Sequence, residues 1–158
     1  MIVADIANKI YTDLDSPSDL SLVSLSFWIR NSVGQLNSRI LTSYSVQSDL
    51  EIRDKDSIEI SEEAVGVYCQ MFLVYYYDKK YRSNLTTMNN NMLLSVKDNA
   101  RTVTFTNRNE VGKAILMAKS QAETELDKLV NGFKSRLAIP RQVVGDDTWL
   151  QSTLPSLN

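Results

Sequence analysis

The chain has 158 residues, of which 43% are hydrophobic and 23% charged, as expected for a soluble globular protein with one core. Its formal net charge of −2 provides no general basic field and argues against non-specific binding to nucleic acid. Histidine is absent and Cys69 is the single cysteine, which excludes a histidine-based site, an internal disulfide and a multi-cysteine zinc site.

Two helices are predicted in the first part of the chain. Apolar residues at helical spacing from Ile2 to Leu14 predict a short helix over residues 2–14. The sequence DSPSD then has the features of a helix start, with Ser16 as N-cap and Pro17 in the first turn. A period of 3.6 residues follows and predicts a second helix of about five turns. Its apolar positions are Leu22, Leu25, Ile29, Val33, Leu36 and Ile40.

A polar segment and a very apolar helix come next. Residues 43–60 are rich in acids, and their DKDSIE sequence lacks the glycine turn and last ligand of a calcium loop, so we expect a solvated loop. Ser61 caps a helix that continues to about Arg82. This helix is apolar on nearly every side, so it is either the centre of a bundle or partly buried by another subunit.

A β-hairpin and a long helix are predicted in the second half. A polar loop is expected after Asn84, and the β-branched alternation that follows predicts a projecting hairpin at about residues 92–106. A strongly amphipathic helix starts after Asn107 and ends near Ala138, because Pro140 cannot continue it. Its apolar positions are Val111, Ile115, Ala118, Ala122, Leu126, Leu129, Phe133 and Leu137.

The predicted fold is mainly α: a bundle of three to four helices with an inserted β-hairpin and an extended C-terminal arm. Residues 1–140 form the helical domain and residues 141–158 the arm. The arm contains Trp149, Leu150 and Leu154, which is unusual for a solvated tail and typical of a segment that docks on a partner. Four glycines fall inside predicted helices, which indicates close helix crossings or simple tolerance. They are Gly34, Gly66, Gly112 and Gly132.

Motifs for chemistry are sparse. The chain has no glycine-rich phosphate loop, nucleophile elbow or metal-ligand spacing, so we expect neither an enzyme nor a cofactor. The N-terminus lacks the basic start and apolar core of a signal peptide, and the longest apolar run, about residues 64–77, is too short to span a bilayer. The sequence therefore predicts a protein made in the cytoplasm, with no membrane partner.

The stretch VYYYDKKYR at residues 74–82 allows two interpretations. Tyrosines beside Lys79, Lys80 and Arg82 can stack bases and hold phosphates, which favours nucleic-acid binding. Alternatively, the cations stabilise the end of a helix and pair with acids of a neighbouring subunit. Helical phasing assigns Tyr75 and Tyr76 to packing and leaves Tyr77 and Tyr81 for a subunit interface.

Three segments carry a resemblance to a known family. They are PSDLSLVSLSFWIRNSVGQLNSRILTSYSV, VYYYDKKYRSNL and FKSRLAIPRQVVGDD. Together they resemble the small head–tail connector (adaptor or neck) proteins of tailed bacteriophages, in the form found in marine and cyanobacterial phages. The resemblance implies a structural virion protein that forms a ring, typically of twelve subunits, beneath the portal at the capsid vertex.

The resemblance also implies partners and a location. Such a ring contacts the portal on one side and the tail, a tail terminator or a nozzle on the other, and double-stranded DNA passes through its channel without sequence recognition. The subunit is made in the host cytoplasm and resides in the virion neck. The hairpin either lines the channel or contacts the tail. The arm is expected to reach the portal through Arg141, Val143, Val144, Trp149, Leu150 and Leu154. The alternative is a DNA-contacting accessory or head-completion factor that uses residues 75–82.

Overall fold

A computed structural model describes the backbone of residues 1–90, 95–98, 101–104 and 108–138, and the side chains of residues 1–86 and 110–138. Over these residues the chain forms four helices and two small antiparallel strand pairs. The helices are α1 (Val3–Asp13), α2 (Leu22–Ile40), α3 (Glu62–Asn90) and α4 (Arg108–Leu137). The strands are β1 (Ser45–Val46) with β2 (Ile52–Arg53), and β3 (Ser95–Asp98) with β4 (Arg101–Thr104). The predicted helical bundle with an inserted hairpin is confirmed, whereas the predicted arm, residues 141–158, lies outside the described residues.

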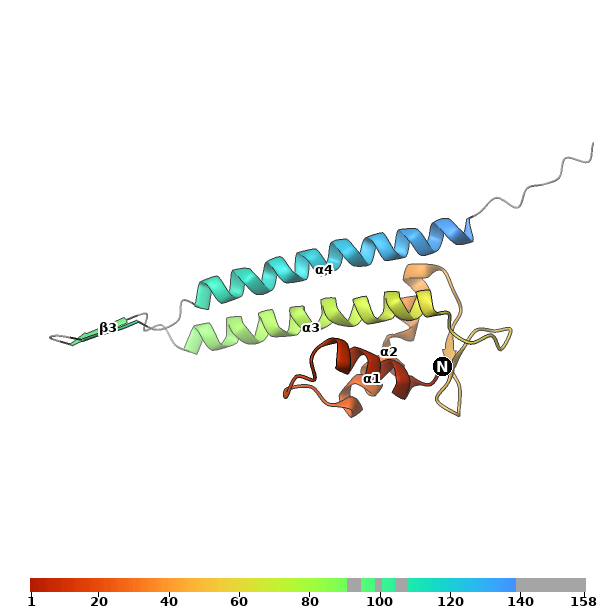
Figure 1. The fold of residues 1–158 in the computed structure, drawn as a ribbon, viewed down its shortest axis with the longest axis horizontal. Coiled ribbons are helices and arrows are strands. Elements are labelled where there is room, and N and C mark those ends of the chain that lie inside the picture. Colours follow the sequence, from red (N-terminus) through yellow and green to blue (C-terminus); the bar gives the residue numbers. More distant parts are fainter. Residues whose placement is uncertain (91–94, 99–100, 105–107, 139–158) are drawn as a thin grey trace, which may run out of the picture.

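The longest feature of the molecule is the antiparallel pair of α3 and α4. The two helices lie side by side, and the β3–β4 hairpin lies beyond the end where α3 finishes and α4 begins (Figure 1). Helices α1 and α2 lie against the other end of the pair, around the first half of α3 (Figure 1). The half of the α3–α4 pair near the hairpin is therefore not covered by α1 or α2.

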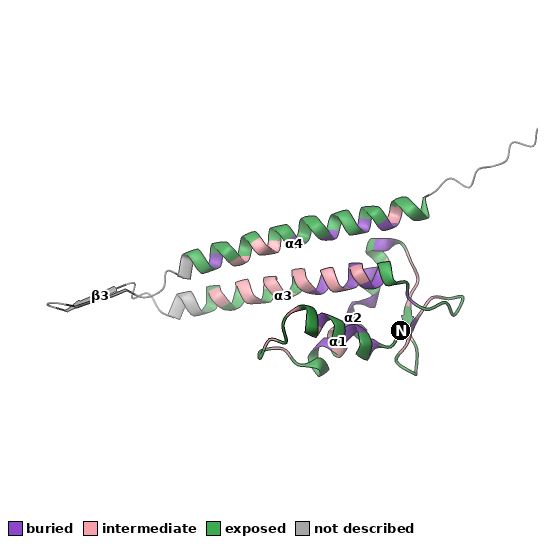
Figure 2. Ribbon diagram, viewed as in Figure 1, coloured by how far each residue is buried: buried purple, intermediate pink, exposed green. Residues whose placement is uncertain are grey.

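The core lies where α1 and α2 meet the first half of α3, and Figure 2 shows the buried positions gathered there. Its largest fully buried side chains include Tyr68, Phe72, Ile6, Leu25, Ile29, Leu36 and Ile40. The hydroxyl of Tyr68 donates a hydrogen bond to the carbonyl of Ile29 and lies 3.1 Å from Ser32 Oγ. Burial raises the pKa of Tyr68 to about 12. This satisfied polar group fixes α3 against α2.

The predicted start of the second helix at Ser16 and Pro17 is wrong. Helix α2 begins at Leu22, with Ser21 as N-cap. The N–H of Ser24 donates to Ser21 Oγ over 3.2 Å, and the N–H of Ser21 donates to Ser24 Oγ over 3.3 Å. This reciprocal cap satisfies two backbone donors at the start of a helix that begins at Leu22. The backbone also has φ values of 56° and 52° at Asp15 and Ser16, which no helix adopts.

The solvated loop predicted for DKDSIE is confirmed, since residues 55–59 are exposed, but the rest of residues 43–60 is not simply polar loop. The segment forms the β1–β2 pair, and Ile52 and Ile60 are buried in the core. The N–H of Val3 donates to the carbonyl of Leu50 over 2.9 Å, so the segment is tied to the start of α1. The many acids of this segment point to solvent around two isoleucines, which made the pattern look polar throughout.

Helix α3 does not end near Asn84, as predicted, but continues to Asn90. Thr86 Oγ1 donates to the carbonyl of Arg82 over 3.0 Å, which keeps this hydroxyl within the helix. On α4, a Cβ at Gly112 would lie 3.0 Å from Asn84 Nδ2. The close approach of α4 explains why α3 continues through residues of weak helix propensity. Of the four helical glycines, Gly112 is the one at which the predicted close helix crossing is observed.

Candidate functional site

An aromatic cluster joins α2 to α3. The ring of Trp28 lies 5.0 Å from that of Phe72 and 5.6 Å from that of Tyr75, and the ring of Tyr76 stacks on Phe72 at 6.3 Å. Tyr76 is half-buried, whereas Tyr75 is 44% exposed at the edge of the cluster. Tyr75 and Tyr76 thus take part in packing within the subunit, as helical phasing predicted.

Two of the three cations in the VYYYDKKYR stretch are paired within the chain. Lys80 Nζ lies 2.9 Å from Asp19 Oδ2 and 5.3 Å from the centre of the Tyr76 ring, and the hydrogen bond from Lys80 lowers the pKa of Asp19. Arg82 lies 2.7 Å from Asp78, one turn earlier. Lys79 is exposed and makes no ion pair with the side chains that the structure describes. These intramolecular pairs compete with the predicted pairing to a neighbour.

Tyr77 and Tyr81 belong to a stripe along α3 that is incompletely covered. With gaps of 4, 3, 4 and 4 residues, the stripe lies on one face of the helix. Its members are Gly66, Gln70, Leu73, Tyr77 and Tyr81, and all five are half-buried. The opposite side of the same helix contains fully buried side chains, Tyr68 and Phe72 among them. The stripe therefore remains available as the predicted interface.

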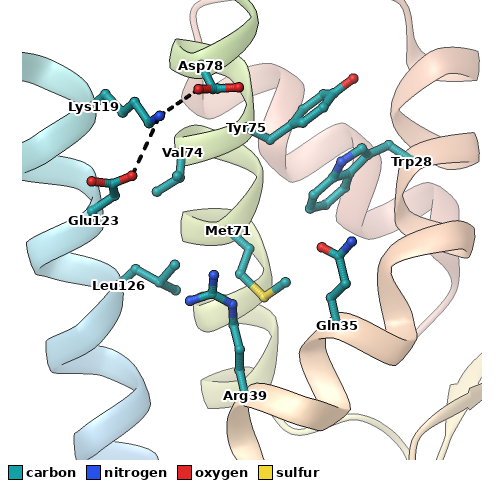
Figure 3. Close-up of a pocket in the computed structure, with 10 residues that line it drawn as sticks. All are labelled: Trp28, Gln35, Arg39, Met71, Val74, Tyr75, Asp78, Lys119, Glu123 and Leu126. Atoms are coloured by element: carbon teal, nitrogen blue, oxygen red, sulfur yellow. Dashed lines mark hydrogen bonds and ion pairs between the residues drawn. The ribbon is translucent and has the colours of Figure 1, made fainter. Parts of the chain in front are cut away.

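A groove of about 380 Å³ lies where α2, α3 and α4 meet (Figure 3); we call it the α2–α4 groove. Met71, Val74 and Leu126 provide apolar surface, and Trp28 and Tyr75 lie at one end (Figure 3). Its polar residues include Gln35, Arg39, Asp78, Lys119 and Glu123. The groove combines apolar surface with two cations and two anions, so it carries little net charge.

An ion pair connects α3 to α4 along this groove, and a second, longer one lies within α4. Lys119 Nζ lies 2.6 Å from Asp78 Oδ1 and 3.8 Å from Glu123 Oε1. The hydrogen bond from Lys119, followed by the charges of Lys119 and Arg82, lowers the pKa of Asp78. The patterns in the sequence gave no sign of this contact, because Asp78 and Lys119 are 41 residues apart and on different helices.

Replacement of Lys119 by alanine is expected to raise the pKa of Asp78 toward its usual value near 3.8. The reason is the loss of the strongest hydrogen bond to the charged carboxylate. Because the pKa is lowered by folding, its contribution to stability is complete above the unfolded value and is lost as the pH falls through the folded value. Carboxyl NMR titration of both proteins measures the shift. Arg82→Ala is the matched control and should cause a smaller rise; an unchanged pKa in Lys119→Ala would contradict the assignment.

The reactive groups of the described side chains do not converge. No group of three or more Cys, Asp or Glu residues there is arranged to hold a metal ion. Burial raises the pKa of the Cys69 thiol to about 11, which disfavours the nucleophilic thiolate at neutral pH. None of the helices over the described ranges combines the length and hydrophobicity needed to cross a bilayer.

Comparisons with protein-family models, with curated proteins and with solved structures found no match to this chain. The residues predicted to dock on the portal lie outside the described residues. They are Arg141, Val143, Val144, Trp149, Leu150 and Leu154.

Proposed function

We propose that this chain is a structural subunit that assembles into a closed ring and acts as a head–tail connector of a tailed bacteriophage. One observation carries the proposal: large apolar side chains are exposed on the outer faces of the helices. On α2, Val23 is 80% and Phe27 is 68% exposed, and Met117 on α4 is also exposed. Apolar side chains grouped on a surface and rimmed by polar residues are typical of protein–protein contacts.

The resemblance in sequence supports assembly of this chain into a connector ring. The segments that resemble head–tail connectors include α2, the VYYYDKKYRSNL part of α3, and the end of α4 with the residues that follow it. On this proposal about twelve subunits form the ring, the portal lies on one side, and the tail or a nozzle lies on the other. The β3–β4 hairpin, beyond one end of the α3–α4 pair, contacts either the tail or the channel (Figure 1).

The proposed role is mechanical. A heterologous contact repeated around an axis closes into a ring and needs no reactive group. The net charge of −2 per subunit favours a channel to which DNA does not adhere, because a negative protein repels the negative phosphates of DNA. The arm, residues 141–158, joins the ring to the portal, with Trp149 and Leu150 as its apolar anchors.

Recruitment to the portal tests this function. The full chain is expected to co-sediment with portal particles, and deletion of residues 141–158 should abolish co-sedimentation because the anchors are lost. Trp149→Ala combined with Leu150→Ala should have nearly the same effect, whereas the control Ser152→Ala combined with Ser156→Ala should bind normally. A full chain that does not bind portal would contradict the function, and a truncated chain that binds normally would contradict the role of the arm.

A DNA-contacting accessory factor is the second candidate. It is favoured by the closeness in sequence of Lys79, Lys80 and Arg82 to the half-buried rings of Tyr77 and Tyr81. It is weakened by the pairs Lys80–Asp19 and Arg82–Asp78, which occupy two of the cations. A monomer whose affinity for DNA falls steeply with salt, and falls again in Lys79→Ala, would support this candidate over the connector.

A further inference from the structure

At three positions inside helices, no contact within the subunit requires glycine in place of a larger residue. A Cβ at Gly34, Gly66 or Gly132 would meet no atom within 4 Å, yet glycine inside a helix costs about 1 kcal/mol relative to alanine. Gly34 lies on α2, Gly66 on α3 and Gly132 on α4. Glycine allows another backbone or a large side chain to approach closely. Each of these positions has open space where a neighbouring helix could approach.

The first surface is the face of α2 that points away from the core. Val23, Phe27, Arg30 and Gly34 follow one another at gaps of 4, 3 and 4 residues and so form one ridge, which we call the α2 ridge. The buried residues of α2, such as Leu25 and Leu36, lie on the other side of the helix. Arg30 is exposed and forms no ion pair with any side chain the structure describes.

The ridge is basic as well as apolar. Between Leu20 and Ser48 the only charged residues are Arg30 and Arg39, and both are cations. Arg39 lines the α2–α4 groove of Figure 3, so Arg30 is the charge that belongs to the ridge. A surface that fits the ridge needs an apolar hollow and a free carboxylate.

The second surface has an exposed leucine and a carboxylate, beside the cations Lys128 and Arg136, of which Arg136 is paired with Glu63 of the same chain. A groove of about 420 Å³, the α3–α4 groove, lies between α3 and α4, with Gln70 on α3 and the remaining lining residues on α4. The α4 residues that line it are Glu125, Lys128, Leu129, Gly132 and Arg136. Leu129 is exposed there, and Gly132 leaves space beside it. Gln70 also belongs to the half-buried stripe of α3 that includes Tyr77 and Tyr81.

Glu125 supplies the carboxylate. It accepts hydrogen bonds from Gln70 Nε2 over 3.4 Å and from Gln121 Nε2 over 3.2 Å. Neither donor is charged, and among the described side chains no cation lies in ion-pair contact with this carboxylate. Glu125 can therefore accept a charged hydrogen bond from outside the subunit, which is stronger than a neutral one.

The ridge and the groove cannot meet within one copy. The α2–α4 groove includes residues of α2, whereas the α3–α4 groove includes none, so α2 covers the other side of the α3–α4 pair. The ridge in turn points away from the core that α2 forms with α3. A contact between two different surfaces of identical subunits is heterologous, and heterologous contacts generate rings.

We propose that the α2 ridge of one subunit docks in the α3–α4 groove of the next copy, with Phe27 packed on Leu129 and Arg30 paired with Glu125. This inference rests on the proposed ring and assigns the two surfaces that form it. Gly34 on the ridge and Gly66 and Gly132 beside the groove allow the helices to approach closely. Tyr77 and Tyr81, predicted from the sequence as interface residues, lie on the same face of α3 as Gln70.

Two charge reversals test this docking. Arg30→Glu places two carboxylates at every contact and Glu125→Arg places two cations there, so each variant alone is expected to dissociate about tenfold or more readily than the wild type. An equimolar mixture should assemble again, because the reversed ridge of one variant meets the reversed groove of the other and the two unchanged surfaces also meet. Sedimentation velocity over a concentration series measures assembly, and thermal unfolding by circular dichroism shows that each variant is folded.

Arg39→Glu is the matched control. It makes the same change of charge on the same helix, but in the α2–α4 groove, so it should leave assembly as in the wild type. If the wild type forms rings and the reversals at positions 30 and 125 do not weaken them, or the mixture of the two variants stays dissociated, this docking is wrong and the ring proposal stands. If the wild type stays monomeric both alone and with portal, the docking and the ring are both wrong.

Discussion

Replacement of Phe72 by alanine is expected to lower the free energy of unfolding by about 3–5 kcal/mol, the range found for large aromatic side chains in cores. Phe72 is 2% exposed, and its ring contacts those of Trp28, Tyr75 and Tyr76. Its loss leaves a cavity between α2 and α3 at the centre of the aromatic cluster. Equilibrium unfolding in urea, followed by circular dichroism, measures the change.

Tyr75→Ala is the control for this variant because Tyr75 belongs to the same cluster but is 44% exposed, whereas Phe72 is buried. Only its ring contacts with Trp28 and Phe72 are lost, and such contacts contribute about 0.5–1.5 kcal/mol each. The two variants should therefore differ clearly in stability. Equal losses would show that the cluster does not centre on Phe72.

Replacement of Tyr77 or Tyr81 by alanine is expected to weaken assembly by about 2 kcal/mol, roughly thirtyfold in the dissociation constant, as for an interface tyrosine that carries much of the binding energy. The stability of the isolated subunit should change by less than about 1 kcal/mol, because both side chains are only half-buried at the surface of α3. Sedimentation velocity measures the first quantity and urea unfolding the second.

Tyr44→Ala provides the comparison for the two interface variants. Tyr44 is also half-buried, but it lies beside β1 and on neither the α2 ridge nor the α3–α4 groove. It should assemble as the wild type does. Normal assembly of both Tyr77→Ala and Tyr81→Ala would move the interface to another part of the chain.

Helical periodicity predicted the helices better than their exact faces. Five of the six apolar positions assigned to α2 are buried, and Leu22 is the exception. In α4, the predicted row included Leu129 and Leu137, which are exposed, and omitted Val130, which is buried. Helix α4 packs mainly on α3 and therefore buries a narrow stripe, and a small rotation changes which residues lie in it.

The remaining errors come from contacts that are distant in sequence or from competing local bonds. The cap at Ser21 competes with that at Ser16, and the sequence contains acceptable residues for both. Ile52 and Ile60 are buried because the segment folds back over the start of α1, a contact that no local pattern encodes.

The candidate site was predicted in part. The α3 stripe with Tyr77 and Tyr81 follows from helical phasing alone, and the structure leaves it half-buried. The α2 ridge was not predicted, because only the core row of that helix was assigned from the periodicity. The signal was present, since Val23 and Phe27 are apolar residues four apart on the face opposite the core row.

The mass of the full chain in solution tests the central claim most directly. Mass photometry over a range of concentrations is expected to show one closed species of about twelve times the 17.9 kDa of the subunit, either alone or added to the mass of the portal. A closed ring gives a single upper limit of mass, because no contact surface remains free. A 17.9 kDa monomer at every concentration, both alone and with portal, would contradict the claim.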